Sequence, residues 1–420
     1  MKFLHENCLV QKNDIENGSS KFSEYLNLLN DVVSKNSYEQ PESFLHLPLD
    51  QEIRQKIQEI KNEKITSELK YIIVIGIGGS SLGAKAIYDA LLGYDDSFSD
   101  KSPKMIFVDT DNPDFLFEVK NLLSSISNSE QVIINIITKS GDTMETVVNS
   151  EVLLEGAFTG MESRIIVTTN AGSKLEQASK EKGISVFNIP EKVGGRFSVF
   201  SFAGMLPLAL CGIDINKIAE GAVSANNEYL KESSENLAIL SAIIEYSHYK
   251  AGKNIWDHFF FNSQLESLGK WCRQLIAESL GKEGQGPTPT VSIGTNDLHS
   301  MVQLYLGGPK DKNTTFIFSE KNKNDELVPD SFPKVIEGVS GKEVSELAKI
   351  VFEGVKKTYF ESGLPYSEIV LDGISEFSIG EFMQFKMIEV LCLAKLMNVN
   401  PFGQPNVELY KNNVREALSN

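Results

Sequence analysis

Short runs of β-branched and aliphatic residues alternate with helical patterns through the first half of the chain. Five of these runs predict buried strands, at residues 71–75, 105–108, 132–137, 164–168 and 184–189. Segments with helical spacing separate most of them. Strands that alternate with helices are typical of a parallel, doubly wound sheet with helices on both faces. The pattern therefore predicts a three-layer α/β/α domain.

The pattern changes after about residue 205. A long segment, 215–249, carries apolar residues at intervals of three and four and predicts a helix. New strand candidates follow at 254–261, 315–319 and 368–371, with helical segments between them, and 406–418 predicts a terminal helix. We therefore expect an N-terminal helical layer, two α/β domains with mostly parallel sheets and a C-terminal helix, at residues 1–65, 66–205, 206–400 and 401–420.

Charge and cysteine content narrow the functional classes. The 420-residue chain has 40 basic and 57 acidic residues, a formal charge of −17, which disfavours binding to a nucleic-acid backbone or an anionic membrane. An anionic small substrate fits only where local donors overcome this field. The four cysteines form no CxxC pair, which favours reduced thiols in a cytoplasmic protein and argues against a zinc site. No run of about 18 apolar residues predicts a membrane span.

The first candidate site is the turn GIGGSSLG at 76–83, between a predicted strand and a predicted helix. Glycines let a backbone approach an anion closely, and the N–H groups of a helix N-terminus point at negative charge. The turn fits neither a dinucleotide fingerprint, because Ser81 replaces the third glycine, nor a P-loop, because Ala84 precedes Lys85. The turn, with Gly79 and Ser80, predicts a binding site for one phosphate or for sugar hydroxyls. The alternative is a tight turn without a ligand.

A second turn, TKSGDTMET at 138–146, follows the third strand. It supplies the hydroxyls of Thr138, Ser140 and Thr143, with the cation of Lys139 between them. Open α/β sheets bind ligands at the carboxyl ends of their strands, and hydroxyls with a lysine suit a phosphate monoester. The alternative is a helix-capping box formed by Thr143 and Thr146.

A third turn, EKVGGRFSVFS at 191–201, places two glycines before Arg196. The glycines allow close approach of the backbone to a ligand, and the arginine supplies a permanent cation. Apolar neighbours make a solvated surface arginine the less favoured alternative.

These three turns, in this order and spacing, resemble the phosphoglucose isomerase family, also called glucose-6-phosphate isomerase, in its short bacterial form. Three further stretches continue the resemblance: QLIAESLGK at 274–282, GTNDLHSMVQLYLGG at 294–308 and NPFGQPNVELYK at 400–411. The resemblance covers about residues 66–415. It implies two doubly wound, flavodoxin-like domains of the sugar isomerase (SIS) superfamily.

The resemblance also implies an activity. Family members interconvert glucose 6-phosphate and fructose 6-phosphate by ring opening and proton transfer through a cis-enediolate, a step of glycolysis and gluconeogenesis. They need no cofactor. They pair as homodimers, with each site taking the counterpart of His299 from the other chain. The glycine–aspartate pair at 141–142 departs from animal members, so the resemblance indicates the reaction type rather than the sugar preference.

Two residues stand out on chemical grounds. Glu278 shares a predicted helix face with Trp271 and Leu275, one turn before Gly281, where the negative helix end should make it a better base. His299 follows a capping cluster at 295–297 and is expected in the first turn of a helix, where a neutral imidazole could exchange protons during ring opening.

The resemblance assigns the remaining roles. Arg196 would stabilise the enediolate, Lys411 would assist ring opening or bind near the phosphate, and Gln274 and Gln404 would contact the sugar or its phosphate. No cluster of His, Asp and Glu has metal-ligand spacing, so we expect no metal. Two alternatives stay open: a non-catalytic regulator that binds sugar phosphates, and a nicotinamide-dependent oxidoreductase, which the missing glycine disfavours.

Overall fold

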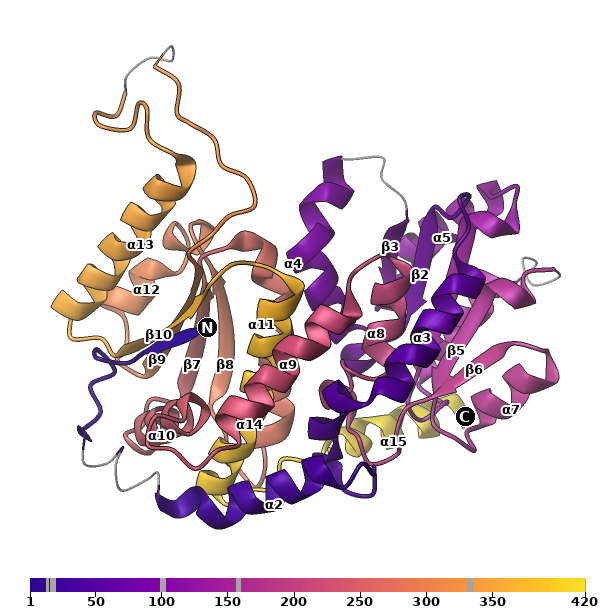
Figure 1. Cartoon of the computed structure of the whole chain (residues 1–420), viewed down its shortest axis with the longest axis horizontal. Coiled ribbons are helices and arrows are strands. Elements are labelled where there is room, and N and C mark those ends of the chain that lie inside the picture. The colour runs from indigo at the N-terminus through magenta and orange to yellow at the C-terminus, as the bar shows by residue number, and fades with distance from the viewer. Residues whose placement is uncertain (13–14, 16–19, 99–102, 156–159, 331–334, 420) are drawn as a thin grey trace.

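Two five-stranded sheets lie side by side in the computed structural model, with a group of helices between them (Figure 1). The structure describes residues 1–12, 15, 20–98, 103–155, 160–330 and 335–419. The chain thus has the mixed α/β architecture with mostly parallel sheets that the sequence predicts. Within the described ranges, no helix combines the length and the apolar character that a membrane span needs.

The first sheet has five parallel strands in the order β3-β2-β4-β5-β6. Its strands are β2 (Tyr71–Ile75), β3 (Lys104–Val108), β4 (Val132–Ile137), β5 (Ile165–Thr169) and β6 (Ser185–Asn188). This confirms the five predicted runs. Because β3 and β4 flank β2 on opposite sides, the chain reverses its winding between β2 and β4, and that is where such sheets bind ligands.

Helices cover both faces of this sheet. One face packs on α3 (Gln51–Lys64), α4 (Leu82–Phe98) and α8 (Phe202–Leu210), and the other on α5 (Pro113–Ser125) and α6 (Met144–Leu154), with α7 (Lys174–Glu181) beside β5 and β6. Ile72 and Val74 of β2 belong to one apolar layer, whereas Ile73 and Ile75 belong to the other. Burial on both sides explains why the strands read as continuous apolar runs.

The second sheet has the order β1-β10-β9-β7-β8. Its strands are β1 (Lys2–Leu4), β7 (Ile255–Phe260), β8 (Thr288–Ile293), β9 (Lys312–Ser319) and β10 (Tyr366–Leu371); β1 alone is antiparallel. One face packs on α10 (Leu237–Lys250), α11 (Glu266–Leu280) and α14 (Glu376–Met397), with α9 (Ile215–Tyr229) against α14. The other face packs on α12 (Val302–Gly307) and α13 (Val344–Glu361).

Three features of the second sheet and its helices differ from expectation. The long predicted helix 215–249 is two helices, α9 and α10, because Asn236 caps a new helix start through its side chain. Strand β8 was not foreseen; it lies at the sheet edge and contains Pro289, which lowers its strand signal. Strand β1 was not foreseen either, so the N-terminal segment contributes an edge strand in addition to helices such as α2 (Ser23–Ser34).

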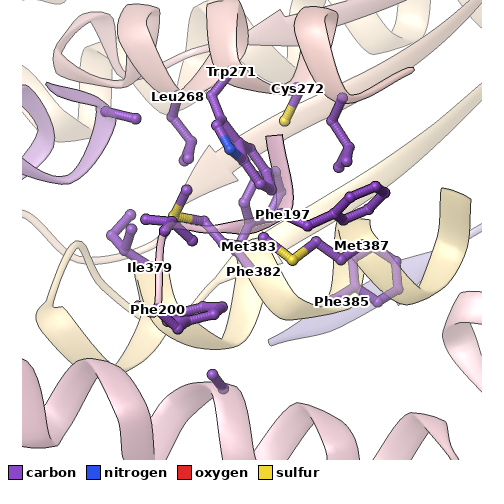
Figure 2. Packing of buried hydrophobic residues seen from close by; sticks show 14 of the residues in the cluster. Phe197, Phe200, Leu268, Trp271, Cys272, Ile379, Phe382, Met383, Phe385 and Met387 are labelled. Atoms are coloured by element: carbon purple, nitrogen blue, oxygen red, sulfur yellow. The ribbon is translucent and has the colours of Figure 1, made fainter. Parts of the chain in front are cut away.

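One apolar cluster includes residues of both sheets and of the helices between them, and Figure 2 shows part of it. Phe197, next to the predicted site arginine, belongs to the same apolar cluster as Trp271 of α11 and Phe382 of α14, and all three are almost fully buried. Phe197 also stacks on Phe44, with 4.4 Å between ring centroids. The turn that carries Arg196 is therefore anchored to helices of the second half. The C-terminal helix α15 (Val407–Ser419), in contrast, has no buried residue.

Candidate active site

The glycine-rich turn lies where the first sheet reverses its winding. Strands β2 and β4 are neighbours, and Ile75 pairs with Ile136, so the two strands end level with each other. The turn forms a short 3₁₀ helix, Gly78–Ser80, ahead of α4. A Cβ on Gly79 would lie 2.3 Å from the carbonyl carbon of Gly195, so only glycine allows this approach. Two of the predicted turns thus touch through their backbones.

The hydroxyls of the second turn gather at the end of β4. The Oγ1 atoms of Thr138 and Thr143 lie 2.9 Å apart, and Ser140 Oγ lies 3.4 Å from Thr143 Oγ1. Thr143 precedes α6, but its side chain makes no capping hydrogen bond. The capping-box alternative is therefore wrong for this hydroxyl, and the three hydroxyls form one cluster beside the glycine-rich turn.

Lys139 adds positive charge to this cluster. Burial lowers the pKa of the Lys139 ammonium; Glu191 opposes this shift, and the cations of Lys192 and Arg196 act in the same direction as burial. The cations of Lys192 and Arg196 therefore lie close enough to Lys139 to interact with its charge. A locally positive region thus exists within a strongly acidic chain, as an anionic ligand requires.

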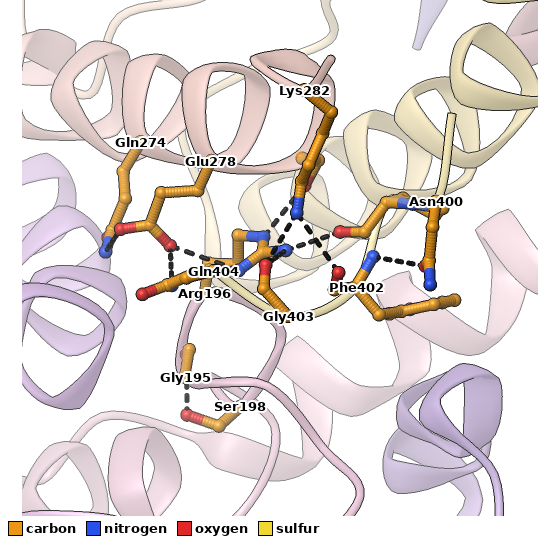
Figure 3. Close-up of polar contacts among 12 residues, drawn as sticks. Gly195, Arg196, Ser198, Gln274, Glu278, Lys282, Asn400, Phe402, Gly403 and Gln404 are labelled. Carbon is orange, nitrogen blue, oxygen red and sulfur yellow. Dashed lines mark hydrogen bonds and ion pairs between the residues drawn. The ribbon is translucent and has the colours of Figure 1, made fainter. Parts of the chain in front are cut away.

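Arg196 joins the two halves of the molecule (Figure 3). It is only 2% exposed, so the solvated-arginine alternative is wrong. Its Nη1 lies 3.1 Å from Glu278 Oε2, and its Nε donates to Ser279 Oγ at 2.8 Å. Its Nη2 donates to the carbonyls of Pro401 and Gly403. Burial lowers the pKa of Arg196, and the Glu278 carboxylate offsets part of this shift.

Glu278 lies in the last turn of α11 and accepts hydrogen bonds from three side chains (Figure 3). Its Oε1 accepts from Gln274 Nε2 at 2.9 Å, and its Oε2 accepts from Gln404 Nε2 as well as from Arg196. The side chain is 26% exposed, so solvent or a ligand can reach it. The structure brings three predicted site residues together around the carboxylate of a fourth, Glu278. The three donors fix the orientation of this carboxylate without filling all of its lone pairs.

Gln274 also connects this carboxylate with the glycine-rich turn. A Cβ on Gly78, which has φ +59°, would lie 3.2 Å from Gln274 Nε2. The Oε1 atom of Gln274 is buried and has no hydrogen-bond partner within the described part of the chain. Glu278, Gln274 and the turn therefore line one region at the junction of the two sheets.

Sequence reasoning missed Lys282 and Ser279. Lys282 Nζ donates to the carbonyls of Phe402 and Gly403 at 3.1 and 2.6 Å (Figure 3). Ser279 supplies the oxygen that receives Arg196 Nε. Lys282 lies beyond the last residue of α11, and its hydrogen bonds reach carbonyls 120 and 121 residues further along the chain, so no local pattern indicated its role. The signal for Ser279 was absent, because a buried hydroxyl next to a carboxylate has no distinctive pattern.

The structure does not join Lys411 to this cluster by any described contact. Lys411 lies on α15, and its Nζ donates to Glu408 Oε1 at 3.1 Å. Its side chain is 40% exposed.

His299 differs from expectation in its local structure. Asn296–Leu298 forms a 3₁₀ turn and His299 follows it, whereas α12 begins only at Val302. Asp297 does not cap a helix; its Oδ2 accepts from Ile293 N and its Oδ1 from Ser300 Oγ. The expectation that His299 lies in the first turn of a helix is therefore wrong.

Within one chain, Glu278 and His299 lie at opposite ends of the second sheet. Strands β7 and β8 are parallel and α11 connects them, so α11 runs antiparallel to both. Glu278, near the end of this 15-residue helix, lies level with the start of β8, and His299 follows the end of β8. A six-residue strand spans about 20 Å, which is more than a side chain bridges.

Structural comparison shows which known proteins share the fold. The fold is shared with a putative phosphosugar isomerase from Clostridium difficile, at a TM-score of 0.55 and 13% identity over 89% of this chain and 97% of that one. It is shared more closely with a glucose-6-phosphate isomerase from Chlamydia trachomatis, at a TM-score of 0.83 and 20% identity over 99% and 88% of the two chains. The architecture is thus that of phosphosugar isomerases.

Sequence comparison identifies the family. The profile of the family "Phosphoglucose isomerase" matches residues 48–420. The glucose-6-phosphate isomerase of Methanocaldococcus jannaschii is 34% identical over 344 residues, which cover 80% of this chain and 81% of that protein. The chain belongs to the phosphoglucose isomerase family and is an isomerase of the aldose–ketose type.

Proposed function

We propose that this chain interconverts D-glucose 6-phosphate and D-fructose 6-phosphate in glycolysis and gluconeogenesis, in the cytoplasm. The observation that carries the proposal is the Glu278 carboxylate, which three donors orient beside the glycine-rich turn at the junction of the sheets. Relatives named glucose-6-phosphate isomerase support the choice of sugar phosphates.

The first α/β domain, residues 66–205, would bind the phosphate. The proposed phosphate-binding residues come from the glycine-rich turn and from the hydroxyl cluster with its lysine. They are Gly79, Ser80, Thr138, Lys139, Ser140 and Thr143. Hydroxyl and backbone donors at the carboxyl ends of neighbouring strands suit a phosphate monoester, and each bond to a charged oxygen contributes about 1.5–3 kcal/mol.

The second domain, residues 206–400, would supply the base, and residues 401–420 would close the site. Glu278 takes the proton from C2 of the open-chain aldose and returns it to C1, while the proton on O2 leaves and O1 gains one. Gln274 and Gln404 hold the carboxylate and lie where they could contact the sugar. A carboxylate on a packed helix keeps its geometry through both proton transfers.

Arg196 would offset the negative charge of the enediolate. Its guanidinium has five N–H groups, which already make four hydrogen bonds to protein atoms. It therefore acts mainly through its fixed charge, buried beside the reacting carboxylate, where electrostatic interactions are stronger than in water.

We further propose a homodimer in which His299 of one chain completes the site of the other. The separation of Glu278 and His299 within a chain supports this arrangement, because a histidine at the far end of the sheet cannot serve its own carboxylate. His299 would move the proton of the ring-opening step, and Lys411 would assist there or bind near the phosphate.

A direct assay separates the proposal from its alternatives. Purified protein is mixed with fructose 6-phosphate, with and without NADP, and the formation of glucose 6-phosphate is measured. We expect glucose 6-phosphate without NADP. Binding without turnover would favour a sugar-phosphate regulator, and turnover that depends on NADP would favour an oxidoreductase. The same assay with mannose 6-phosphate tests sugar preference.

A further inference from the structure

The segment 401–404 places Gln404 against the Glu278 carboxylate, yet it belongs to neither a helix nor a strand. It follows α14, which ends with Asn398 in the left-handed conformation at φ +55°, and it precedes α15. Gly403 has φ +70°. Something other than regular secondary structure must hold this segment in place.

Two buried cations hold its backbone. Arg196 Nη2 donates to the carbonyls of Pro401 and Gly403, and Lys282 Nζ donates to those of Phe402 and Gly403. Three successive carbonyls are thus bound by positive side chains, and Gly403 receives both. We call these hydrogen bonds from Arg196 and Lys282 to the segment the clamp. Hydrogen bonds with a charged partner are stronger than neutral ones, so the clamp can hold the backbone in place without a helix or a strand.

Lys282 is itself rigidly placed. It follows the C-terminus of α11, and its N–H donates to the carbonyls of Leu280 and Gln285 at 2.8 and 3.2 Å. Gln285 N donates back to the carbonyl of Lys282 at 2.8 Å. Lys282 is 9% exposed, so its ammonium is directed at the segment from an anchored turn.

The charges explain why a lysine stands here. Burial lowers the pKa of Lys282, the cation of Arg196 lowers it further, and Glu278 partly offsets both. Two neighbouring cations repel each other, so the carbonyl acceptors of the segment, with that of Gly403 shared, and the nearby Glu278 carboxylate must compensate. A lysine that served only to fill space would not need this arrangement.

We infer that Lys282 is a positioning residue for the reaction: it acts through the 401–404 segment and Gln404 to set the orientation of Glu278. The inference rests on the proposed role of Glu278 as the base. Displacing a catalytic group by about 1 Å can lower the rate by about 100-fold, so a lost clamp should affect turnover more than substrate binding.

The test compares Lys282→Met with Lys253→Met. Lys253 is a matched control, since its ammonium also donates to a backbone carbonyl, that of Lys310, on the same half of the molecule. We expect Lys282→Met to lower kcat at least tenfold and to change KM less than threefold, and Lys253→Met to change neither. A KM increase of tenfold or more with unchanged kcat would show that Lys282 binds substrate and would overturn the inference, as would kcat within twofold of wild type.

A double-mutant cycle tests whether Lys282 works through Gln404. If it does, Lys282→Met combined with Gln404→Leu should lose little more activity than the worse single variant. Losses that multiply would overturn the inference. Lys282→Arg, which keeps the charge and the donors, should recover part of the activity and guards against a variant that folds poorly.

Amide hydrogen exchange provides a readout that does not depend on activity. In Lys282→Met, a peptide that covers residues 399–410 should exchange faster than in wild type or Lys253→Met. Unchanged exchange would contradict the clamp even if the protein acted on another substrate. A wild type without isomerase activity but with faster exchange in Lys282→Met would contradict the proposed function and leave the clamp standing.

Discussion

The backbone of Gly79 lies directly against that of Gly195: a Cβ on Gly79 would lie 2.3 Å from the carbonyl carbon of Gly195 and 2.5 Å from Arg196 N. The glycine-rich turn of the first sheet and the turn that carries Arg196 are therefore packed without room for a side chain. Because Arg196 contacts Glu278, this approach links the phosphate turn to the proposed base.

The first prediction concerns this approach. Gly79→Ala should push the two turns apart, lower the free energy of unfolding by about 1–3 kcal/mol and reduce kcat at least tenfold. Gly93→Ala on α4 is the control, because among the residues that the structure describes its Cβ would meet only Asp89, at 3.6 Å. Replacing a helical glycine by alanine should stabilise the protein by about 0.5–1 kcal/mol. Chemical unfolding and steady-state kinetics measure both effects, and a fully active, stable Gly79→Ala would contradict the close packing.

The second prediction concerns the hydroxyl cluster. Replacing Ser140 and Thr143 by alanine should weaken the binding of a phosphorylated inhibitor by about 1.5–3 kcal/mol for each charge-assisted bond lost. Ser124→Ala, an exposed hydroxyl on α5 that bonds its own helix, is the control and should leave binding unchanged. Calorimetric titration measures the affinities. Equal affinity in the wild type and the double variant would remove these hydroxyls from the phosphate site.

The third prediction tests the shared site. We expect Glu278→Gln and His299→Ala to be inactive alone and to complement each other after unfolding and refolding as an equal mixture. Random pairing makes half of the dimers mixed, each with one intact site, so about a quarter of the wild-type activity should return. If the mixture stays as inactive as each variant refolded by itself, the two residues serve the same chain; an active His299→Ala would show that His299 is not required.

The fourth prediction concerns the pH dependence of stability and the buried carboxyl group of Glu245. Both of its oxygens accept a hydrogen bond from Asn313 Nδ2, each at 2.7 Å. Burial, and then the charge of Glu389, raise the pKa of Glu245 to about 8, while Asn313 and Lys386 oppose the shift. An unfolded glutamate titrates near about 4.3. The contribution of Glu245 to the free energy of unfolding is therefore fully present below about pH 4.3 and is lost as the pH rises through about 8.

Glu245→Gln removes this titration. The free energy of unfolding of the wild type, relative to Glu245→Gln, should fall steadily between about pH 5 and pH 8, since the folded wild type holds the proton more tightly. Urea unfolding at several pH values measures the difference. Glu118→Gln, an exposed carboxylate on α5, is the control. A difference that is independent of pH would mean that Glu245 ionises alike in the folded and unfolded states.

The sequence predicted the first sheet well because its strands are buried on both faces and read as apolar runs; β2 and β4 agree with prediction at both ends. Strands β1 and β8 escaped detection because edge strands bury little: β1 has three residues, and β8 is mostly half-exposed. These two strands form through pairing with distant parts of the chain, and no local sequence pattern indicates that β1 pairs with β10.

The candidate site was predictable in its residue types but not in its contacts. Arg196 and Glu278 were each recognised, but their ion pair joins positions 82 residues apart. The resemblance to a family supplied Gln404, whereas the clamp by Lys282 could be seen only in three dimensions. The expectation for His299 was wrong because a capping sequence also fits a 3₁₀ turn that no long helix follows.

Glu278→Gln tests the proposed chemistry itself. Glutamine keeps the shape and an oxygen that can accept from Arg196, but it cannot take up the proton. Loss of the charge next to a buried arginine should lower the melting temperature, so folding is checked by thermal unfolding. The affinity for a phosphorylated inhibitor should stay similar, and isomerisation should fall by a factor of about 10²–10⁴.

The most direct measurement is the incorporation of solvent deuterium into the sugar phosphate, because the proposed base exchanges its proton with water while the enediolate exists. Wild-type protein in D₂O with fructose 6-phosphate should label C1 of the ketose and C2 of the aldose. Folded Glu278→Gln, with its phosphate affinity retained, should label neither position at an appreciable rate. Labelling by this variant at a rate near that of the wild type would contradict the assignment of Glu278 as the base.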